Sequence, residues 1–370
     1  MKNRRLIIVL LVLISIAYRI IPAAQVSDMV LCSITASDTA GSVPTANLPE
    51  GVKVSSRFWE LLRGNEEQEL LVIPGGSVFG ARVKLENITV ADPGNVSSLK
   101  SGDVLLSLDG KDIRSISEVK ELLAECGDGE VDASFKRGSH TFSAKLPLIR
   151  SGDDAKIGIT LRDSAAGIGT ITYIDPTTRC FGGLGHGICD SESGKLVSIS
   201  SGTVTGVILG GVHKGSSGKP GELSGILTEK HLGSVYSNTE CGVFGKLDTL
   251  PTAGDALKLP VGHREDVKEG EAFIYSTVKN GRTAKFTIEI SDVDTSSHGT
   301  KSFKIKVTDP ALLAITGGIV RGMSGSPIIQ NGKLVGAVTH VMVANPTEGY
   351  GIFIENMLSA AGNQVQPKAA

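Results

Sequence analysis

The sequence has few cysteines, few aromatic residues and no long block of basic residues. Five cysteines among 370 residues are too few for a disulfide scaffold, and none forms a C-x-x-C pair, so we expect neither a metal site nor a cofactor. Aromatic residues make up only 4% of the chain. The 37 basic and 39 acidic residues nearly cancel to a formal charge of −2. This balance argues against nucleic acid as a partner.

Glycine is abundant, and its abundance indicates the fold class. The chain has 46 glycines in 370 residues, or about 12%, against ~7% in an average protein. Together with 40% hydrophobic residues, this predicts a mainly β protein of many short strands joined by tight turns. The length corresponds to roughly two domains of about 150 residues each.

The N-terminus combines cations with an apolar run. Three basic residues precede an uncharged, mostly apolar run from Leu6 to Tyr18. Extended past Arg19 to Ala24, the run reaches about 28 Å as a helix, close to the ~30 Å thickness of bilayer hydrocarbon. We therefore expect residues 1–24 to be an export signal or a membrane anchor, with the rest of the chain outside the cytoplasm. Residues 25–66 have the composition of a linker.

Residues 67–149 change to short β-rich segments. Between residues 98 and 126 the order is a Gly-Asp turn, the strand Val104 to Leu108, an Asp-Gly turn and a helix. Ser117 is the predicted N-cap of that helix, with Val119, Leu122 and Leu123 on its apolar face. This order resembles a PDZ domain in the permuted form attached to exported bacterial proteases, which implies a small α+β domain that binds peptides.

The resemblance also implies a peptide-binding loop. A PDZ domain adds a peptide as a strand beside a sheet edge, and backbone amides in a glycine loop receive the terminal carboxylate. Residues 74–80 could supply such a loop, because glycine leaves the amides unobstructed. The residues expected to form it are Gly75, Gly76, Val78, Phe79 and Gly80.

The strongest catalytic signal surrounds Ser324, in the segment GGIVRGMSGSPIIQNGKLVGAVTHV. A serine flanked by glycines precedes two apolar strands joined by an Asn-Gly turn. This segment is close to the G-D-S-G-G-P motif of chymotrypsin-like peptidases, with Met323 in place of the aspartate. In that arrangement the backbone amides of Gly322 and Ser324 form the oxyanion hole, and losing one such donor costs roughly 3–4 kcal/mol in the barrier.

A serine nucleophile needs a base, and the base needs an orienting group. Among seven histidines, His186 is the first choice, because the glycines around it leave room for a substrate beside the imidazole. His340 is second, since it follows the Ser324 hairpin. For the carboxylate that holds the imidazole, Asp309 is preferred at the end of an alternating strand. Asp175 and Asp190 compete with it, and local spacing does not separate the three.

Three longer segments are similar to the SpoIVB family of stage IV sporulation serine peptidases: LRDSAAGIGTITYIDPTTRCFGGLGHGICD, KVTDPALLAITGGIVRGMSGSPIIQNGKLVGAVTHV and NPTEGYGIFIENML. The resemblance implies an N-terminal membrane segment, a PDZ domain over residues 67–149 and a chymotrypsin-like double β-barrel over residues 150–370. It places the catalytic serine, histidine and aspartate on Ser324, His186 and Asp309.

The resemblance further implies a signalling role. A member of this family is a serine endopeptidase that leaves the forespore, stays anchored or is released between the two forespore membranes, and cleaves itself. It then cuts the extracytoplasmic part of a membrane regulator of an intramembrane protease, which activates a late mother-cell sigma factor. Two alternatives are an inactive PDZ-bearing scaffold, which would lack a triad member, and an HtrA-like quality-control protease, in which the PDZ domain follows the catalytic domain.

Overall fold

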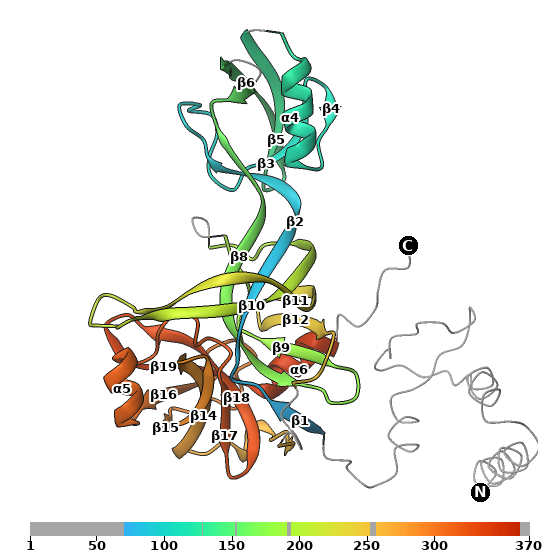
Figure 1. Ribbon diagram of the computed structural model, residues 1–370. Coiled ribbons are helices and arrows are strands. Elements are labelled where there is room, and N and C mark those ends of the chain that lie inside the picture. The colour runs from blue at the N-terminus through green and yellow to red at the C-terminus, as the bar shows by residue number, and fades with distance from the viewer. Residues whose placement is uncertain (1–69, 128, 152–153, 191–193, 252–256, 363–370) are drawn as a thin grey trace, which may run out of the picture. The chain divides into compact units, whose positions relative to one another are not determined.

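The computed structural model describes residues 70–127, 129–151, 154–190, 194–251 and 257–362 (Figure 1). The predicted membrane segment and linker, residues 1–24 and 25–66, lie outside this part. Within the described ranges, every helix is too short or too polar to cross a membrane. The described chain is mainly β, as predicted, and its strands pair antiparallel in barrel-like sheets.

Six strands form a first closed ring, because β2 pairs with both β8 and β10 and so joins the two ends of the path. In ring order they are β8 (Thr160–Ile174), β9 (Cys180–Gly183), β12 (Gly242–Leu247), β11 (Glu222–Thr239), β10 (Ile199–His213) and β2 (Val78–Asp92). Phe79 and Phe181 meet edge to face in its core, with ring centroids 5.6 Å apart. Two short strands, β1 (Leu71–Pro74) and β13 (Leu259–Pro260), extend the sheet beside β8.

Residues 270–353 form another closed barrel. In ring order its strands are β14 (Gly270–Lys279), β15 (Arg282–Ser291), β16 (Phe303–Val307), β19 (Asn345–Phe353), β18 (Lys333–Met342) and β17 (Pro327–Gln330). The accompanying helices are η1 (Arg264–Asp266), α5 (Pro310–Thr316) and α6 (Ile354–Gly362). Asn331 and Gly332 both take positive φ, of 50° and 76°, which is the backbone of the tight turn predicted between β17 and β18.

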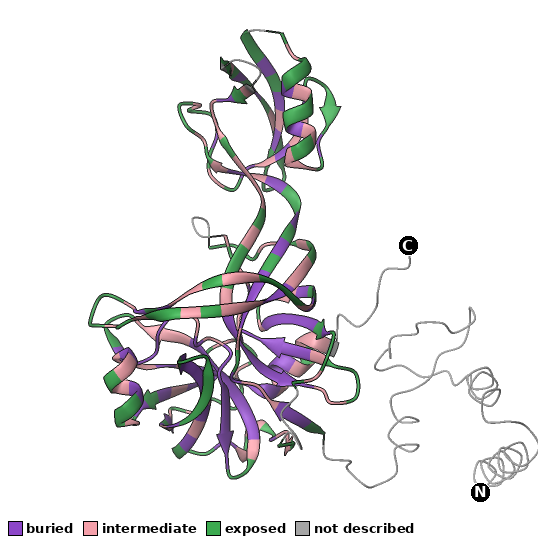
Figure 2. Ribbon diagram, viewed as in Figure 1, coloured by how far each residue is buried: buried purple, intermediate pink, exposed green. Residues whose placement is uncertain are grey.

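A small α/β unit has its own core. Its elements, besides the end of β2 and the start of β8, are β3 (Val104–Leu108), β4 (Lys111–Asp112), α4 (Ile116–Glu125), β5 (Gly129–Arg137), β6 (His140–Ser151) and β7 (Asp154–Ile157). Its buried side chains run from Ile88 to Ile157 and exclude those of the first barrel. Figure 2 shows the buried residues concentrated inside the barrels and beneath α4.

Helix α4 starts two residues earlier than expected. Its N-cap is Ser115, whose hydroxyl accepts from the Glu118 amide at 3.2 Å, so the prediction of Ser117 is wrong. The Glu118 carboxylate in turn accepts from the Arg114 amide at 2.8 Å. Val119 and Leu123, one turn apart, are buried against the sheet, as the apolar spacing predicts.

The boundary predicted for the α/β domain is wrong, because residues 70–85 belong to the first barrel. Strand β2 pairs with β8 from Val78 to Lys84 within the barrel, and with β8 and β3 again from residue 88 onward within the α/β unit. The unit is therefore an insertion spanning about residues 86–163, between two strands of the barrel. Length and turn signals alone gave no indication of this pairing.

The predicted peptide-binding loop is also wrong. The amides of Gly75 and Gly76 already donate to the carbonyl oxygens of Thr172 and Ile171, at 2.9 and 2.8 Å. Val78, Phe79 and Gly80 lie in β2 and pair with Thr170, Gly169 and Ile168 of β8. Because these amides and side chains are used inside the barrel sheet, they are not available to a peptide carboxylate.

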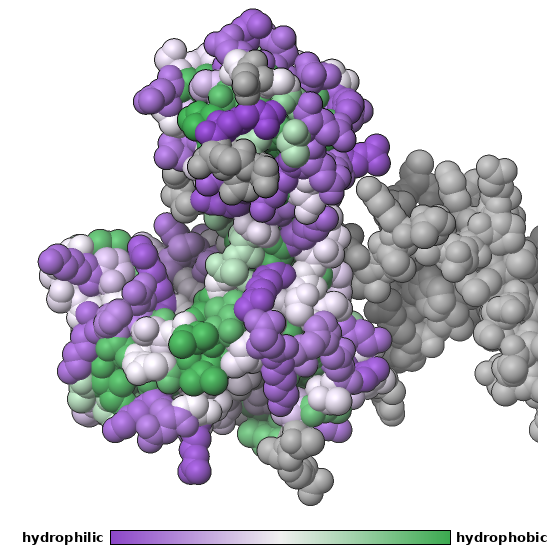
Figure 3. Space-filling view, turned by 45° about the horizontal axis from the view of Figure 1, so that its top comes forward, coloured by the Kyte–Doolittle hydropathy of each residue, from purple (hydrophilic) through white to green (hydrophobic). Residues whose placement is uncertain are grey.

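On the face shown in Figure 3 the surface is mostly hydrophilic, with smaller hydrophobic patches between polar residues. Few large apolar side chains of the described ranges are exposed. Two of these few, Ile208 and Ile226, are directly opposed on the β10–β11 ribbon and are 65% and 74% exposed.

Candidate active site

Ser324 lies in the tight loop that leads into β17. Its hydroxyl donates to the carbonyl oxygen of Thr339 on β18, at 2.8 Å. The side chain is half-buried, so one side of the loop stays open. Gly322, two residues earlier, has a φ of +96°, a conformation that side chains other than glycine rarely adopt. Position 322 therefore requires glycine for its backbone conformation as well as for the space that a small residue leaves.

Strand β8 of the first barrel fixes this loop through hydrogen bonds. The Thr170 hydroxyl donates to the carbonyl oxygen of Gly322 at 2.8 Å, and the Thr172 hydroxyl donates to that of Gly325, also at 2.8 Å. The Thr170 amide donates to the carbonyl oxygen of Ser324 at 3.0 Å. Both threonines are fully buried. These three hydrogen bonds thus fix the peptide planes on both sides of Ser324.

Two amides of the loop are left without a partner. The Met323 amide donates to Val320 and the Gly325 amide donates to Val338, at 3.1 and 2.7 Å. Within the described ranges, the amides of Gly322 and Ser324 make no such bond. Two unpaired amide donors in the loop of a serine nucleophile are what is needed to stabilise the oxyanion of an acyl-transfer intermediate.

His186 lies just after β9, in the first barrel. Its Nδ1 is 2.9 Å from the carbonyl oxygen of Gly187. A carbonyl only accepts, so Nδ1 carries the proton and Nε2 keeps a lone pair. Burial lowers the pKa of His186 below its ordinary value, and the bond to Gly187 only partly opposes this effect. The imidazole is therefore neutral and able to accept a proton at neutral pH.

The histidine loop and the serine loop are packed against each other. A Cβ on Gly325 would lie only 2.5 Å from the Leu184 amide nitrogen, and still closer to the carbonyl oxygen of Thr170. A Cβ on Gly185 would lie 3.0 Å from the Thr339 side chain. The two glycines therefore permit the His186 loop to pack closely against the Ser324 loop and against Thr339 of β18. In the resting arrangement the two side chains bond to separate carbonyl groups rather than to each other.

The structure does not bring Asp309 to this site. Its carboxylate caps α5, accepting from the amides of Ala311 and Leu312 at 2.9 and 3.0 Å, and from the amide of Thr287 at 3.3 Å. Among the described residues, no carboxylate bonds to His186. The predicted contact between Asp309 and the imidazole is thus absent, because both carboxylate oxygens stabilise the start of a helix.

The competing carboxylates are also engaged elsewhere. Asp175 accepts from the Thr177 amide and the Thr178 hydroxyl, at 2.7 and 2.8 Å, and these bonds lower its pKa in spite of the opposing effect of burial. Asp190 pairs with Arg162 at 3.2 Å. Neither supplies the orienting group that a histidine base uses.

His340, the second choice from sequence, lies beside His186. The two ring centroids are 5.1 Å apart, with the planes tilted by 37°. Its Nδ1 is buried, and no other side-chain nitrogen or oxygen of the described ranges is both buried and without a hydrogen-bond partner. Burial, followed by the charges of His186 and Lys301, lowers the pKa of His340 to about 4. It is therefore neutral at neutral pH.

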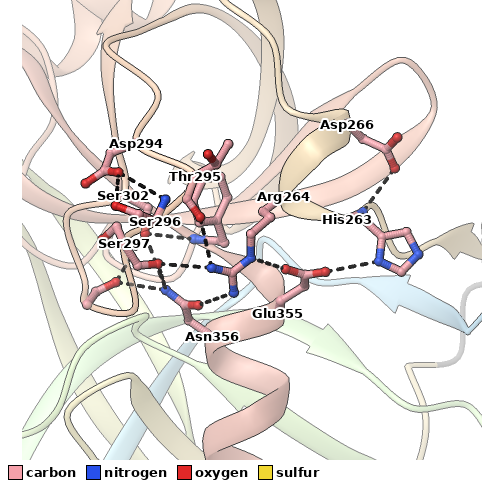
Figure 4. Close-up of polar contacts among 12 residues, drawn as sticks. His263, Arg264, Asp266, Asp294, Thr295, Ser296, Ser297, Ser302, Glu355 and Asn356 are labelled. Atoms are coloured by element: carbon pink, nitrogen blue, oxygen red, sulfur yellow. Dashed lines mark hydrogen bonds and ion pairs between the residues drawn. The ribbon is translucent and has the colours of Figure 1, made fainter.

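A polar network supports the strand that carries these groups (Figure 4). Arg264 of η1 bonds to Glu355 at 2.7 Å and to the carbonyl oxygen of Thr295 at 3.1 Å. Asn356 of α6 donates to the carbonyl oxygens of Ser297 and Gly299, at 3.2 and 3.1 Å. These bonds hold the loop of residues 294–302. In this loop the Thr300 carbonyl oxygen accepts a hydrogen bond from the Thr339 hydroxyl at 2.8 Å. The network thereby fixes the residue whose carbonyl receives Ser324.

Sequence reasoning missed the two threonines of β8 and Thr339. Threonine is common in strands, so its presence alone marks no site. The partners of Thr170 and Thr172 also lie about 150 residues further along the chain, so no local signal identifies these two residues. The sequence signal that was available is the glycines on both loops, because Gly185 and Gly325 permit the close packing there.

Comparison with known proteins supports a peptidase. Residues 153–358 match the model of the SpoIVB peptidase S55 family, which is more than half of the chain. No curated protein sequence matches this chain at a significant level. Among solved structures, the active form of the Rv3671c protease from M. tuberculosis is 14% identical, with a TM-score of 0.33, and the match covers 56% of this chain and 77% of that one. The PDZ domain of an SdrC-like protein from Listeria monocytogenes is 27% identical, with a TM-score of 0.19, over 22% of this chain and 93% of that one.

Proposed function

Because the chain belongs to the SpoIVB peptidase S55 family, we propose that it is a sporulation serine endopeptidase in which Ser324 is the nucleophile and His186 the general base. The observation that supports the proposal is the close packing of the Ser324 loop, at Gly325, against the His186 loop, at Leu184, together with the two unpartnered amides of Gly322 and Ser324. The two closed barrels, and the hydrogen bonds between β8 of the first barrel and the serine loop of the second, support this proposal.

The mechanism is acyl transfer through a covalent intermediate. The Ser324 hydroxyl turns from the Thr339 carbonyl oxygen to His186 Nε2, which takes its proton as the oxygen attacks the scissile carbonyl. The amides of Gly322 and Ser324 then bind the oxyanion. The protonated imidazole gives its proton to the leaving amine, and water, activated by the same histidine, hydrolyses the acyl-enzyme.

The family also suggests the biological substrate. We propose that the enzyme cleaves itself and then cuts the extracytoplasmic part of a membrane regulator, which triggers intramembrane proteolysis and activates a late mother-cell sigma factor. This requires a position outside the forespore cytoplasm, anchored in the membrane or released into the space between the forespore membranes. The α/β unit would bind a peptide of the substrate or of the enzyme itself, as its PDZ-like order of elements predicts.

Fluorophosphonate labelling tests the chemistry. We expect the full chain to be labelled at Ser324, and Ser324→Ala to stay folded but unlabelled and unable to cleave itself. Ser326→Ala is the matched control, because Ser326 is two residues away, buried, and bonded to Ser276 at 3.1 Å. Labelling or self-cleavage that persists in Ser324→Ala, or an adduct on Ser326, contradicts the proposal.

A further inference from the structure

Very few residues form the open side of the nucleophile loop. From residue 318 to residue 330 every residue is buried except at three positions. Gly322 and Ser324 are half-buried, and Arg321 alone is exposed. A substrate that reaches Ser324 from solvent therefore meets Arg321 as the one long side chain of this stretch.

Strand β11 fixes the backbone of Arg321. Its amide donates to the carbonyl oxygen of Gly221 at 2.9 Å, and its carbonyl oxygen accepts from the Leu223 amide at 2.8 Å. The side chain thus leaves the loop from a defined point, one residue before the unpaired amide of Gly322. Because an extended chain spans at most about 3.6 Å per residue, the Cα atoms of Arg321 and Ser324 are no more than about 11 Å apart.

The guanidinium of Arg321 has no partner among the described residues, neither a carboxylate in an ion pair nor a hydrogen-bond acceptor. Glu222 is its neighbour across the backbone bridge to β11, but the Glu222 carboxylate lies 3.2 Å from His213 Nδ1 instead. Other arginines do pair with carboxylates, such as Arg82, Arg137, Arg162 and Arg264. A guanidinium with all of its donors free can bind a carboxylate of a ligand through two parallel hydrogen bonds.

We propose that Arg321 is a specificity-determining residue that binds an acidic side chain of the substrate close to the scissile bond. The inference rests on the proposed function and names a feature of the substrate which that function leaves open. The oxyanion binds at the Gly322 amide, so the substrate residues beside the scissile bond lie within reach of the neighbouring guanidinium. Its planar fork matches the carboxylate of an aspartate or glutamate and repels a lysine or arginine at the same place.

A second exposed cation has to be distinguished from Arg321. The Nζ atom of Lys301 lies over the Tyr350 ring, 5.1 Å from its centroid, and the charge of Lys301 lowers the pKa of His340 beside His186. Both cations favour an anionic substrate. They belong to different segments, so each can be neutralised without altering the other.

Three fluorophosphonates that differ only in charge test the inference on the full chain. At the end of the same short linker they carry a carboxylate, its neutral carboxamide or an ammonium group. We expect the carboxylate probe to label Ser324 about 2- to 5-fold faster than the carboxamide probe, the size of an exposed ion pair, and the ammonium probe to be slowest. The preference is expected to disappear at about 1 M salt, where charges are screened beyond ~3 Å.

Variants assign this preference to one side chain. In Arg321→Gln the ratio of carboxylate to carboxamide labelling is expected to fall to about one, and in Arg321→Glu the ammonium probe becomes the fastest. Arg282→Glu is the matched control, because Arg282 is an exposed arginine at the start of β15 and its replacement changes the net charge equally. Arg282→Glu and Lys301→Gln should both keep the wild-type ratio. Circular dichroism checks that each variant is folded.

Equal slowing of all three probes in Arg321→Gln would assign Arg321 to the oxyanion rather than to a substrate side chain and would overturn the inference. An unchanged ratio in Arg321→Glu, or a preference that is lost in Lys301→Gln instead, would overturn it as well. These outcomes are separable from the proposed function. If the probes label Ser324 in ratios that do not depend on residue 321, the peptidase assignment stands and the role of Arg321 falls. If no probe labels Ser324, the assignment itself falls.

Discussion

At the scale of single residues, Asp309 shows how one carboxylate can fit two predictions. The segment TDPALL places an aspartate at the end of a strand, and it also places an N-cap aspartate before a proline at the first helical position. The structure has the second arrangement. The segment therefore carries the signal of a helix cap as well as that of a strand end, and only the contacts of the carboxylate separate the two roles.

Substitution at Asp309 separates the two roles. Asparagine is as good an N-cap as aspartate, whereas alanine loses the cap at a cost of about 1 kcal/mol. We therefore expect Asp309→Asn to keep both stability and labelling, and Asp309→Ala to lose about 1 kcal/mol in urea unfolding with little change in labelling per folded molecule.

Ser115→Ala is the matched control, because Ser115 caps α4 in the α/β unit by the same kind of bond. A fall of about 10⁴-fold in activity in Asp309→Asn, the size seen when a triad aspartate is removed, would instead restore Asp309 to the catalytic unit.

His186 and Ser324 were predictable because their surroundings are local. Glycines on both sides of each residue and the Asn-Gly turn after Ser324 appear in the sequence itself. The contacts of Thr170 and Thr172 were not predictable in this way, since they join a strand of the first barrel to a loop of the second.

At the scale of elements, β8 acts as the support of the nucleophile loop. Removing one hydroxyl tests this support. In Thr170→Val the Gly322 carbonyl oxygen loses its partner, and an unpaired buried acceptor costs about 1–3 kcal/mol. We expect lower thermal stability and slower fluorophosphonate labelling, because the Gly322 peptide plane is no longer fixed.

Thr170→Ser restores the hydroxyl and is expected to restore the labelling rate. Thr160→Val, an exposed position at the other end of the same strand, is the control and should change neither quantity. If Thr170→Val is labelled as fast as the wild-type protein, the hydrogen bond from Thr170 to Gly322 does not position Ser324.

Strands bounded by strong turns were the most predictable elements. The strand Val104–Leu108 and the β17–β18 hairpin lie where the Asp-Gly and Asn-Gly turns place them. The glycine loop at residues 74–80 was assigned to the wrong domain, because its hydrogen-bond partners on β8 come about 90 residues later. Local patterns reveal that a segment is a strand but not which sheet it joins.

At the scale of the whole described molecule, the α/β unit is an insertion in a barrel with a separate core. Lys84 and Ser164 are paired on β2 and β8, so the two strands can be rejoined at that point. We expect a chain in which residues 86–163 are replaced by Asn-Gly, which keeps Leu85 in the barrel and allows a short hairpin turn, to fold and to label at Ser324.

Circular dichroism and labelling of this shortened chain, beside the full chain, provide the measurement. A Ser324→Ala version of the shortened chain controls for labelling elsewhere. An insoluble product, or a folded one without labelling, would mean that the barrel depends on the insertion for its stability or its activity.

The α/β unit is attached through both β2 and β8, which has a consequence for proteolysis. A domain at the end of a chain is lost after one cut, whereas this one remains covalently attached by the second strand after a nick in the first. Nicked material would therefore migrate as intact protein in its native state and separate into fragments only in denaturant. Processing that is meant to release the unit has to cut the backbone twice.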